Sequence, residues 1–227
     1  MIFSSKATPR WQQAVAGLVC AASLLVLVSC GGSTTQYETF RPGRVLAFGD
    51  DASVLTPSGQ RYGVNGLNAD TNQVDCTQFP LWIQSVAGLY GFTFAQCNPT
   101  SVFDPKARTY ATVGAKVADV AAQVEAQVAA GGFRDNDLAL VLAGTNDVLD
   151  LYGQYPLRPE ASLLEDARER GRRMAQVVNR LVDLGAKVIV SNLPDMGLSP
   201  YAAQQAAANP DIDRAAMISR ITAAFNE

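Results

Sequence analysis

The sequence predicts one α/β domain in which a parallel sheet lies between two layers of helices. Short apolar runs alternate along the chain with longer segments whose apolar residues recur every three or four positions. Uninterrupted apolar strands are typical of a parallel sheet that helices cover on both faces. A length of 227 residues, 48% of them hydrophobic, suits one such domain with appendages and excludes wholesale disorder.

Four short apolar runs are the candidate strands of this sheet. The first, 44–48 (RVLAF), ends at Gly49, and 138–143 (LALVLA) is the clearest of the four. The runs 92–95 (FTFA) and 187–191 (KVIVS) complete the set. In parallel α/β folds the functional loops leave the carboxyl ends of the strands, so the residues after each run are the candidate site residues.

The segments between the strands carry helical spacing or none. Helices are expected over 79–90, 114–130, 160–184 and 211–226. The first of these has Pro80 in its first turn. One apolar stripe follows the second helix through four valines: Val117, Val120, Val124 and Val128. Residues 52–78 are rich in Gly, Asn, Thr and Asp without a sustained period, which predicts a long loop.

The first 29 residues have the pattern of a secretory signal. Lys6 and Arg10 precede the apolar stretch 14–28, which as a helix would rise about 22 Å, short of a bilayer core. The sequence LVSC that ends at Cys30 resembles the lipobox of bacterial lipoproteins. The resemblance implies that Cys30 is lipidated and becomes the mature N-terminus. Because glycine and not aspartate follows Cys30, it also implies an outer-membrane anchor.

The mature chain is expected to be a tether, 30–43, followed by a domain over 44–227. Loss of the signal removes two of the 18 basic residues and none of the 21 acidic ones, which leaves a formal charge of −5. This acidity argues against a nucleic-acid partner. The oligomeric state cannot be read from the sequence.

Two cysteines, Cys76 and Cys97, remain in the predicted mature domain, an even pair in a protein with an export signal. Cys76 lies before the expected helix 79–90, and Cys97 lies after the expected strand 92–95. The helix would descend about 18 Å and the strand would climb back about 16 Å. Both cysteines therefore return to one rim of the sheet, which predicts a disulfide with a Cα separation of about 5.5 Å.

Short motifs follow the strands in a characteristic order. GDD (Gly49 to Asp51) follows the first strand, Gly114 lies between the second and third, and GTND (Gly144 to Asp147) follows the third. NLPDMG, at 192–197, follows the fourth. Together they resemble the SGNH or GDSL-type esterases and lipases, which carry GDS, a glycine, GxND and often an NLPPLG-like turn at these places. The resemblance covers roughly residues 44–227.

The resemblance implies a three-layer α/β/α sandwich of flavodoxin-like type and the hydrolysis of acyl or acetyl esters without a cofactor or metal. In that family the serine of GDS attacks the acyl carbon. Its backbone N–H, the N–H of the glycine and the amide of the GxND asparagine stabilise the oxyanion. By position, Asp51 stands where the nucleophile would be, and Gly114 and Asn146 match the other two residues.

Two departures from the family pattern predict impaired catalysis. Asp51 is a weak attacker of esters, and its charge opposes the developing oxyanion. Ser53 lies two residues further on and is a poor substitute for the missing serine. The 227 residues contain no histidine, whereas the family takes its base from a DxxH motif after a last strand. The sequence reaches Glu227 before such a strand, so the sheet is expected to lack it. Truncation, a longer chain and a non-catalytic descendant remain open.

Two alternatives use the same residues differently. Asp50, Asp51 and Asp147 could hold Mg²⁺ for phosphoryl transfer, but no lysine follows Lys187 and the DxD spacing of phosphatases is absent. The stronger alternative is a non-catalytic lipoprotein that binds acyl or carbohydrate groups in the old cleft. The leading hypothesis is a hydrolase-like outer-membrane lipoprotein whose partners are an ester-bearing lipid or carbohydrate and, through its anchor, the membrane.

Overall fold

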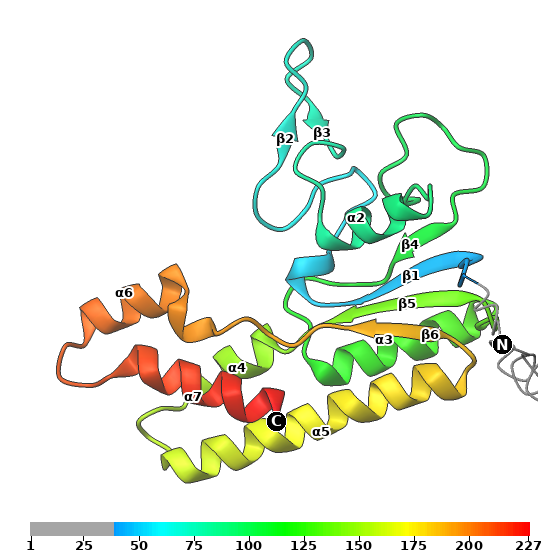
Figure 1. The fold of residues 1–227 in the computed structure, drawn as a ribbon. Helices are drawn as coiled ribbons and strands as arrows, with labels where there is room; N and C mark the ends of the chain where they lie inside the picture. Colours follow the sequence, from blue (N-terminus) through cyan, green and yellow to red (C-terminus); the bar gives the residue numbers. More distant parts are fainter. Residues whose placement is uncertain (1–38) are drawn as a thin grey trace, which may run out of the picture. The chain divides into compact units, whose positions relative to one another are not determined.

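The computed structural model describes residues 39–227, and Phe40–Glu227 form one compact unit. The predicted signal 1–29, Cys30 and most of the predicted tether lie outside the described residues. Four strands pair in parallel in the order β4-β1-β5-β6 (Figure 1). They are β1 (Arg44–Gly49), β4 (Ala107–Thr109), β5 (Asp137–Leu142) and β6 (Lys187–Val190). The predicted parallel α/β architecture is therefore confirmed.

Six α-helices are assigned within the described residues. They are α2 (Trp82–Leu89), α3 (Val117–Ala129), α4 (Thr145–Tyr152), α5 (Glu160–Asp183), α6 (Pro200–Ala208) and α7 (Arg214–Asn226). No helix in this described part of the chain is long and apolar enough to cross a membrane. Helices α4 and α6 were not predicted, although Val148, Leu151 and Tyr152 of α4 are buried at helical spacing.

Alternate residues of the central strands divide the core into two clusters. Leu46 and Phe48 of β1 pack with α3, α4, α5 and α7, while Val45 and Ala47 pack with α2 on the other face. Strand β5 alternates in the same way. Because each face of the sheet meets a helical layer, both sets of strand side chains are buried, which explains the uninterrupted apolar runs.

The second strand of the sheet is β4 and not the predicted run 92–95. That run forms only one parallel bridge, between Phe94 and Ala107, at the outer side of β4. Two backbone hydrogen bonds hold it there, from Ala95 N to Ala107 O at 2.8 Å and from Ala107 N to Thr93 O at 3.3 Å. The pairing ends because the chain turns at once, with Cys97 N donating to the Phe94 carbonyl. A prediction from apolar runs alone placed the strand one segment too early.

Three further segments differ from their predicted structure. Helix α2 begins after Pro80, because the carbonyls of Gln78 and Phe79 accept from the Arg61 guanidinium and not from helical N–H groups. The predicted loop 52–78 contains a short antiparallel hairpin, β2 (Gly66–Leu67) with β3 (Val74–Asp75). On α3 the buried stripe includes Gln123 and Gln127, while Val128 is only half-buried. The buried stripe therefore keeps Val117, Val120 and Val124 of the predicted four valines and gains the two glutamines.

The predicted disulfide is present. Cys76 and Cys97 are joined with a Cα–Cα distance of 5.7 Å. The route between them differs from the predicted one, since α2 has eight residues and the segment 92–95 contributes only a bridge. The bond ties the loop that carries the β2–β3 hairpin to the chain segment beside β4.

Candidate active site

Asp51, Gly114 and Asn146 meet at the carboxyl end of the sheet. The Gly114 backbone N–H donates to both carboxylate oxygens of Asp51, at 3.2 and 3.3 Å. The side-chain amide of Asn146 donates to Asp51 Oδ2 at 2.6 Å. Asp51 opens the 3-10 turn Asp51–Ser53 directly after β1, and Asn146 lies in the first turn of α4 after β5. Strands β1 and β5 are neighbours, and their carboxyl ends are where an open α/β sheet binds ligands.

Gly114 is required by its backbone conformation. Its φ is +77°, a region that residues with a Cβ rarely adopt, and this conformation aims the N–H at Asp51. A Cβ on Gly114 would meet nothing within 4 Å. Within the folded chain, the need for glycine at this position is therefore conformational.

Asn146 has both of its amide protons engaged. Besides Asp51, the Asn146 Nδ2 donates to the Ala115 carbonyl at 3.1 Å. Both partners are pure acceptors, so the hydrogen bonds themselves identify this atom as the nitrogen. The second bond holds the Asn146 side chain against the loop that carries Gly114.

Asp50 links the end of β1 to the start of α4. Its carboxylate is fully buried and accepts from Ala52 N at 3.3 Å and from Thr145 N at 3.2 Å. Asp50 therefore caps the 3-10 turn Asp51–Ser53. Burial raises the pKa of Asp50 above its ordinary value, and the hydrogen bonds from Ala52 and Thr145 oppose this shift.

Gln123 fixes the turn that precedes Asp51. Its side chain accepts from Gly49 N at 2.8 Å and donates to Gly49 O at 2.9 Å, and both groups are buried. Gly49 has φ +147°, and a Cβ there would stand 2.0 Å from the Leu142 carbonyl oxygen. Sequence reasoning missed Gln123; the available signal was an amide side chain on the buried face of α3 between two valines.

Asp147, next to Asn146, connects α4 to α3 and α5. Its Oδ2 accepts from Val117 N at 2.9 Å, and its Oδ1 lies 3.4 Å from Arg170 Nη1. Burial raises the pKa of Asp147 although Arg170 opposes the shift. The Asp147 carboxylate thus faces α3 and α5, whereas those of Asp50 and Asp51 face the start of α4. Within residues 39–227 these three aspartates do not form a group that could hold a metal ion, which does not favour the shared Mg²⁺ site considered above.

Two ion pairs of Asp150, in the next turn of α4, add to these connections. Asp150 accepts from Lys116 Nζ at 2.8 Å and from Arg170 Nη2 at 2.7 Å. The hydrogen bond from Lys116, followed by those of Arg170, lowers the pKa of Asp150. The beginning of α3 is thus attached to α4 by Val117 and by Lys116.

Ser53 has no access to a substrate. Its side chain is fully buried, and its Oγ accepts from the Trp82 indole N–H at 3.0 Å. The fourth motif, NLPDMG at 192–197, makes its hydrogen bonds to residues other than Asp51. Leu193 pairs through its N–H and carbonyl with the Asn226 side chain, and Asp195 caps the turn at Gly197. The NLPDMG segment therefore attaches to α7.

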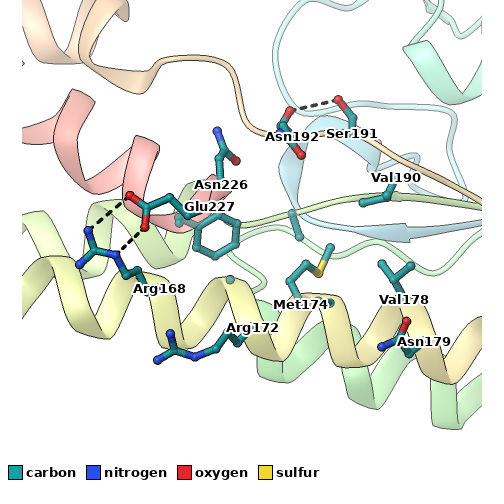
Figure 2. A pocket seen from close by; sticks show the side chains of 14 residues that line it. Arg168, Arg172, Met174, Val178, Asn179, Val190, Ser191, Asn192, Asn226 and Glu227 are labelled. Carbon is teal, nitrogen blue, oxygen red and sulfur yellow. Dashed lines mark hydrogen bonds and ion pairs between the residues drawn. The ribbon is translucent and has the colours of Figure 1, made fainter.

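A separate groove lies between α5, the end of β6 and the end of α7 (Figure 2). It encloses about 510 Å³, and Met174, Val178, Val190 and Phe225 supply apolar side chains to its lining. At one side Glu227 accepts from Arg168 Nε at 2.6 Å. Asp51, Gly114 and Asn146 do not line this groove, so the predicted site and the groove are distinct surfaces.

The fold and site together define a parallel α/β domain with a polar site where β1 and β5 end. Comparisons of the chain with models of known protein families and with curated proteins find no match.

Proposed function

We propose that the domain is a hydrolase-like domain of the SGNH or GDSL type, in which Asp51 occupies the place where that family binds an ester carbonyl. The observation that carries the proposal is the convergence of the Gly114 N–H and the Asn146 amide on residue 51. Two preorganised donors aimed at the position that follows the first strand are what stabilisation of an acyl oxyanion requires. The sheet order, in which the chain's first strand lies between its second and third, agrees with a flavodoxin-like arrangement.

The same contacts support impaired catalysis in this chain. The Asp51 carboxylate occupies both donors, so an ester carbonyl has no free N–H group there. The negative charge of Asp51 also opposes formation of a second anion beside it. No histidine among the 227 residues is present to act as a general base. The chain therefore has the frame of an ester hydrolase and lacks the groups that would drive the reaction.

The proposed setting is the outer membrane of a bacterium, with the chain anchored through lipid on Cys30. Its proposed partners are an ester-bearing lipid or carbohydrate and the membrane itself. The alternative is a non-catalytic protein that binds an acyl carbonyl at Gly114 and Asn146. The hydrogen bonds of these two residues do not support it. The two donors that such a carbonyl would need are already bonded to Asp51.

The catalytic part of the proposal is tested with short p-nitrophenyl esters and purified protein. We expect no turnover above buffer for the parent chain, and none for Asp51→Ser, because a serine without a base stays a weak nucleophile. Turnover by the parent chain that disappears in Asn146→Ala would overturn impaired catalysis. Turnover restored by Asp51→Ser alone would show that no histidine is needed.

The anchor is tested separately in a bacterial host. Labelling with a radioactive or clickable fatty acid should mark the protein, and Cys30→Ala should abolish both the label and cleavage of the signal. Cys20→Ala serves as the matched control and should leave labelling unchanged. Equal labelling of the Cys30→Ala variant would contradict lipidation at that residue.

A further inference from the structure

We infer that Asp51 acts as a tethered carboxylate ligand, so that Gly114 and Asn146 form a binding site for small monocarboxylates which the chain itself fills. The side chain of Asp51 is held in the way a bound anion is held. Each carboxylate oxygen faces the Gly114 N–H, and Oδ2 also receives the Asn146 amide at 2.6 Å.

The chemistry of the donors selects a carboxylate. Gly114 offers an N–H and Asn146 an NH₂ group, so the site presents donors and no acceptor to the ligand. Hydrogen bonds to an ionised acceptor are about twice as strong as bonds between neutral groups. A carboxylate can use two oxygens on these donors, whereas an ester carbonyl offers one uncharged oxygen.

The donors are positioned by contacts that do not involve the Asp51 side chain. The Asn146 amide is also bonded to the Ala115 carbonyl, and the loop that follows Gly114 is attached to α4 through Val117 and Asp147. The start of α4 is in turn fixed to Asp50 through Thr145 N. The site should therefore persist when the carboxylate of Asp51 is removed.

The size of the ligand follows from the atoms removed. Replacing Asp51 with glycine deletes a CH₂–COO⁻ group, which has the heavy atoms of acetate. Replacing it with alanine deletes only the COO⁻ group, which has those of formate. The inference does not rest on the proposed function, because two N–H donors bind a carboxylate whether or not the domain descends from an esterase.

The test is chemical rescue of Asp51→Gly, followed by thermal unfolding in sodium acetate and in sodium chloride at equal ionic strength. A ligand that binds only the folded protein raises the unfolding midpoint with its concentration. We expect a rise of about 3–6 °C when acetate reaches ten times its dissociation constant. The parent chain should show no such rise, because Asp51 fills the site.

Two further variants separate this site from a general effect of acetate. Asp51→Gly combined with Asn146→Ala lacks a donor and should lose most of the rise. Asp51→Asn still fills the space and should also show none. Equal shifts in all four proteins, or in Asp51→Gly with sulfate at equal ionic strength, would mean an unspecific salt effect and would overturn the inference.

Failure of Asp51→Gly to fold in chloride does not end the test. The measurement then becomes the yield of folded protein after dilution from denaturant into acetate or chloride, and a higher yield in acetate is expected. Asp51→Ala with formate is the second variant and should reproduce the effect with the smaller ligand. Equal yields for both variants in carboxylate and chloride would overturn the inference. Ester turnover is not measured in any arm, so failure here is distinct from failure of the proposed function.

Discussion

The side-chain nitrogen of Asn146 lies 2.6 Å from a carboxylate oxygen of Asp51, a residue 95 positions earlier in the chain. The two are brought together by the register of β1 and β5, in which Phe48 is opposite Val141 and Gly49 is opposite Leu142. Both strands therefore end at one level, and the first turn after each faces the other. This contact joins the two loops that the sequence marks most strongly.

A charge exchange tests whether the Asp51–Asn146 contact stabilises the fold. Asn146→Asp places a second carboxylate against Asp51, and we expect it to lower the free energy of unfolding by about 1–3 kcal/mol at neutral pH. Asp51→Asn added to Asn146→Asp restores one amide and one carboxylate. The double variant should recover at least about 1 kcal/mol, measured by urea unfolding as a double-mutant cycle. Strict additivity of the two changes would show that the contact contributes nothing.

The buried carboxyl of Asp50 should produce a pH dependence of a definite sign. Burial raises its pKa above the ordinary value of 3.8, so the folded protein holds this proton more tightly than the unfolded chain. Its contribution to stability is complete below 3.8 and is lost as the pH rises through the folded-state pKa. We therefore expect the free energy of unfolding of the parent, relative to that of Asp50→Asn, to fall as the pH rises from 3.8 through the folded-state pKa of Asp50.

Asp75 gives the opposite sign and is the matched control. Hydrogen bonds from Thr77 lower the pKa of Asp75 below its ordinary value. The contribution of Asp75 is therefore present above that value and is lost as the pH falls through the folded-state pKa. Relative to Asp75→Asn, the parent should gain stability as the pH rises. Parallel pH profiles for the two comparisons, measured by urea unfolding, would contradict the assignment.

Two helical glycines should respond oppositely to alanine. A Cβ on Gly171 of α5 would stand 2.2 Å from the Phe225 backbone oxygen of α7, so Gly171→Ala should destabilise the fold by about 1–3 kcal/mol. A Cβ on Gly88 of α2 meets nothing within 4 Å. Gly88→Ala should stabilise by about 0.5–1 kcal/mol, since only helix propensity changes. Thermal unfolding of both variants decides the matter, and a stable Gly171→Ala would mean that α5 and α7 do not pack this closely.

The Cys76–Cys97 bond should contribute measurably to stability. It closes a loop with a sequence separation of 21, for which the chain-entropy model gives about 3 kcal/mol. Reductant should therefore lower the free energy of unfolding of the parent by about that amount. The double variant Cys76→Ala/Cys97→Ala should be indifferent to reductant. Two free thiols in protein isolated from the periplasm, detected by mass spectrometry of a non-reduced digest, would contradict the bond.

The outer side of β6 should promote association between copies. Ile189 and Val190 are 42% and 46% exposed. The Ser191 N–H donates to Val141 of β5, so by alternation the backbone groups of Val190 face away from the sheet. Unpaired strand edges pair with other chains, and an edge lysine opposes this. Val190→Lys should reduce the associated fraction in sedimentation velocity, while Val182→Lys, on exposed helix surface, should not. Equal association of both variants would exclude pairing at this edge.

Local patterns predicted much of the fold because they report local requirements. The central strands β1 and β5 are buried on both faces, so their runs are apolar throughout and visible in the sequence. Strand β6 was visible from its apolar residues although most of them stay exposed at the sheet edge. The strand β4 was missed because its sequence, ART, has only three residues and the middle one is charged. This residue, Arg108, can carry a charge because it is exposed. The run 92–95 resembles a strand more closely, yet the turn at Cys97 ends its pairing.

The sequence by itself determined the parallel α/β alternation, the strands β1, β5 and β6, the cysteine pair, and the presence of Asp51, Gly114 and Asn146 in loops at one edge of the sheet. Only the tertiary structure decided that the Asp51 carboxylate fills the two donors, that Ser53 turns inward to Trp82, and that Gln123 holds Gly49. The physical reason is that side-chain direction depends on hydrogen bonds between residues far apart in the chain. Such partners leave no local periodicity, so their pairing becomes visible only when the strands are in register.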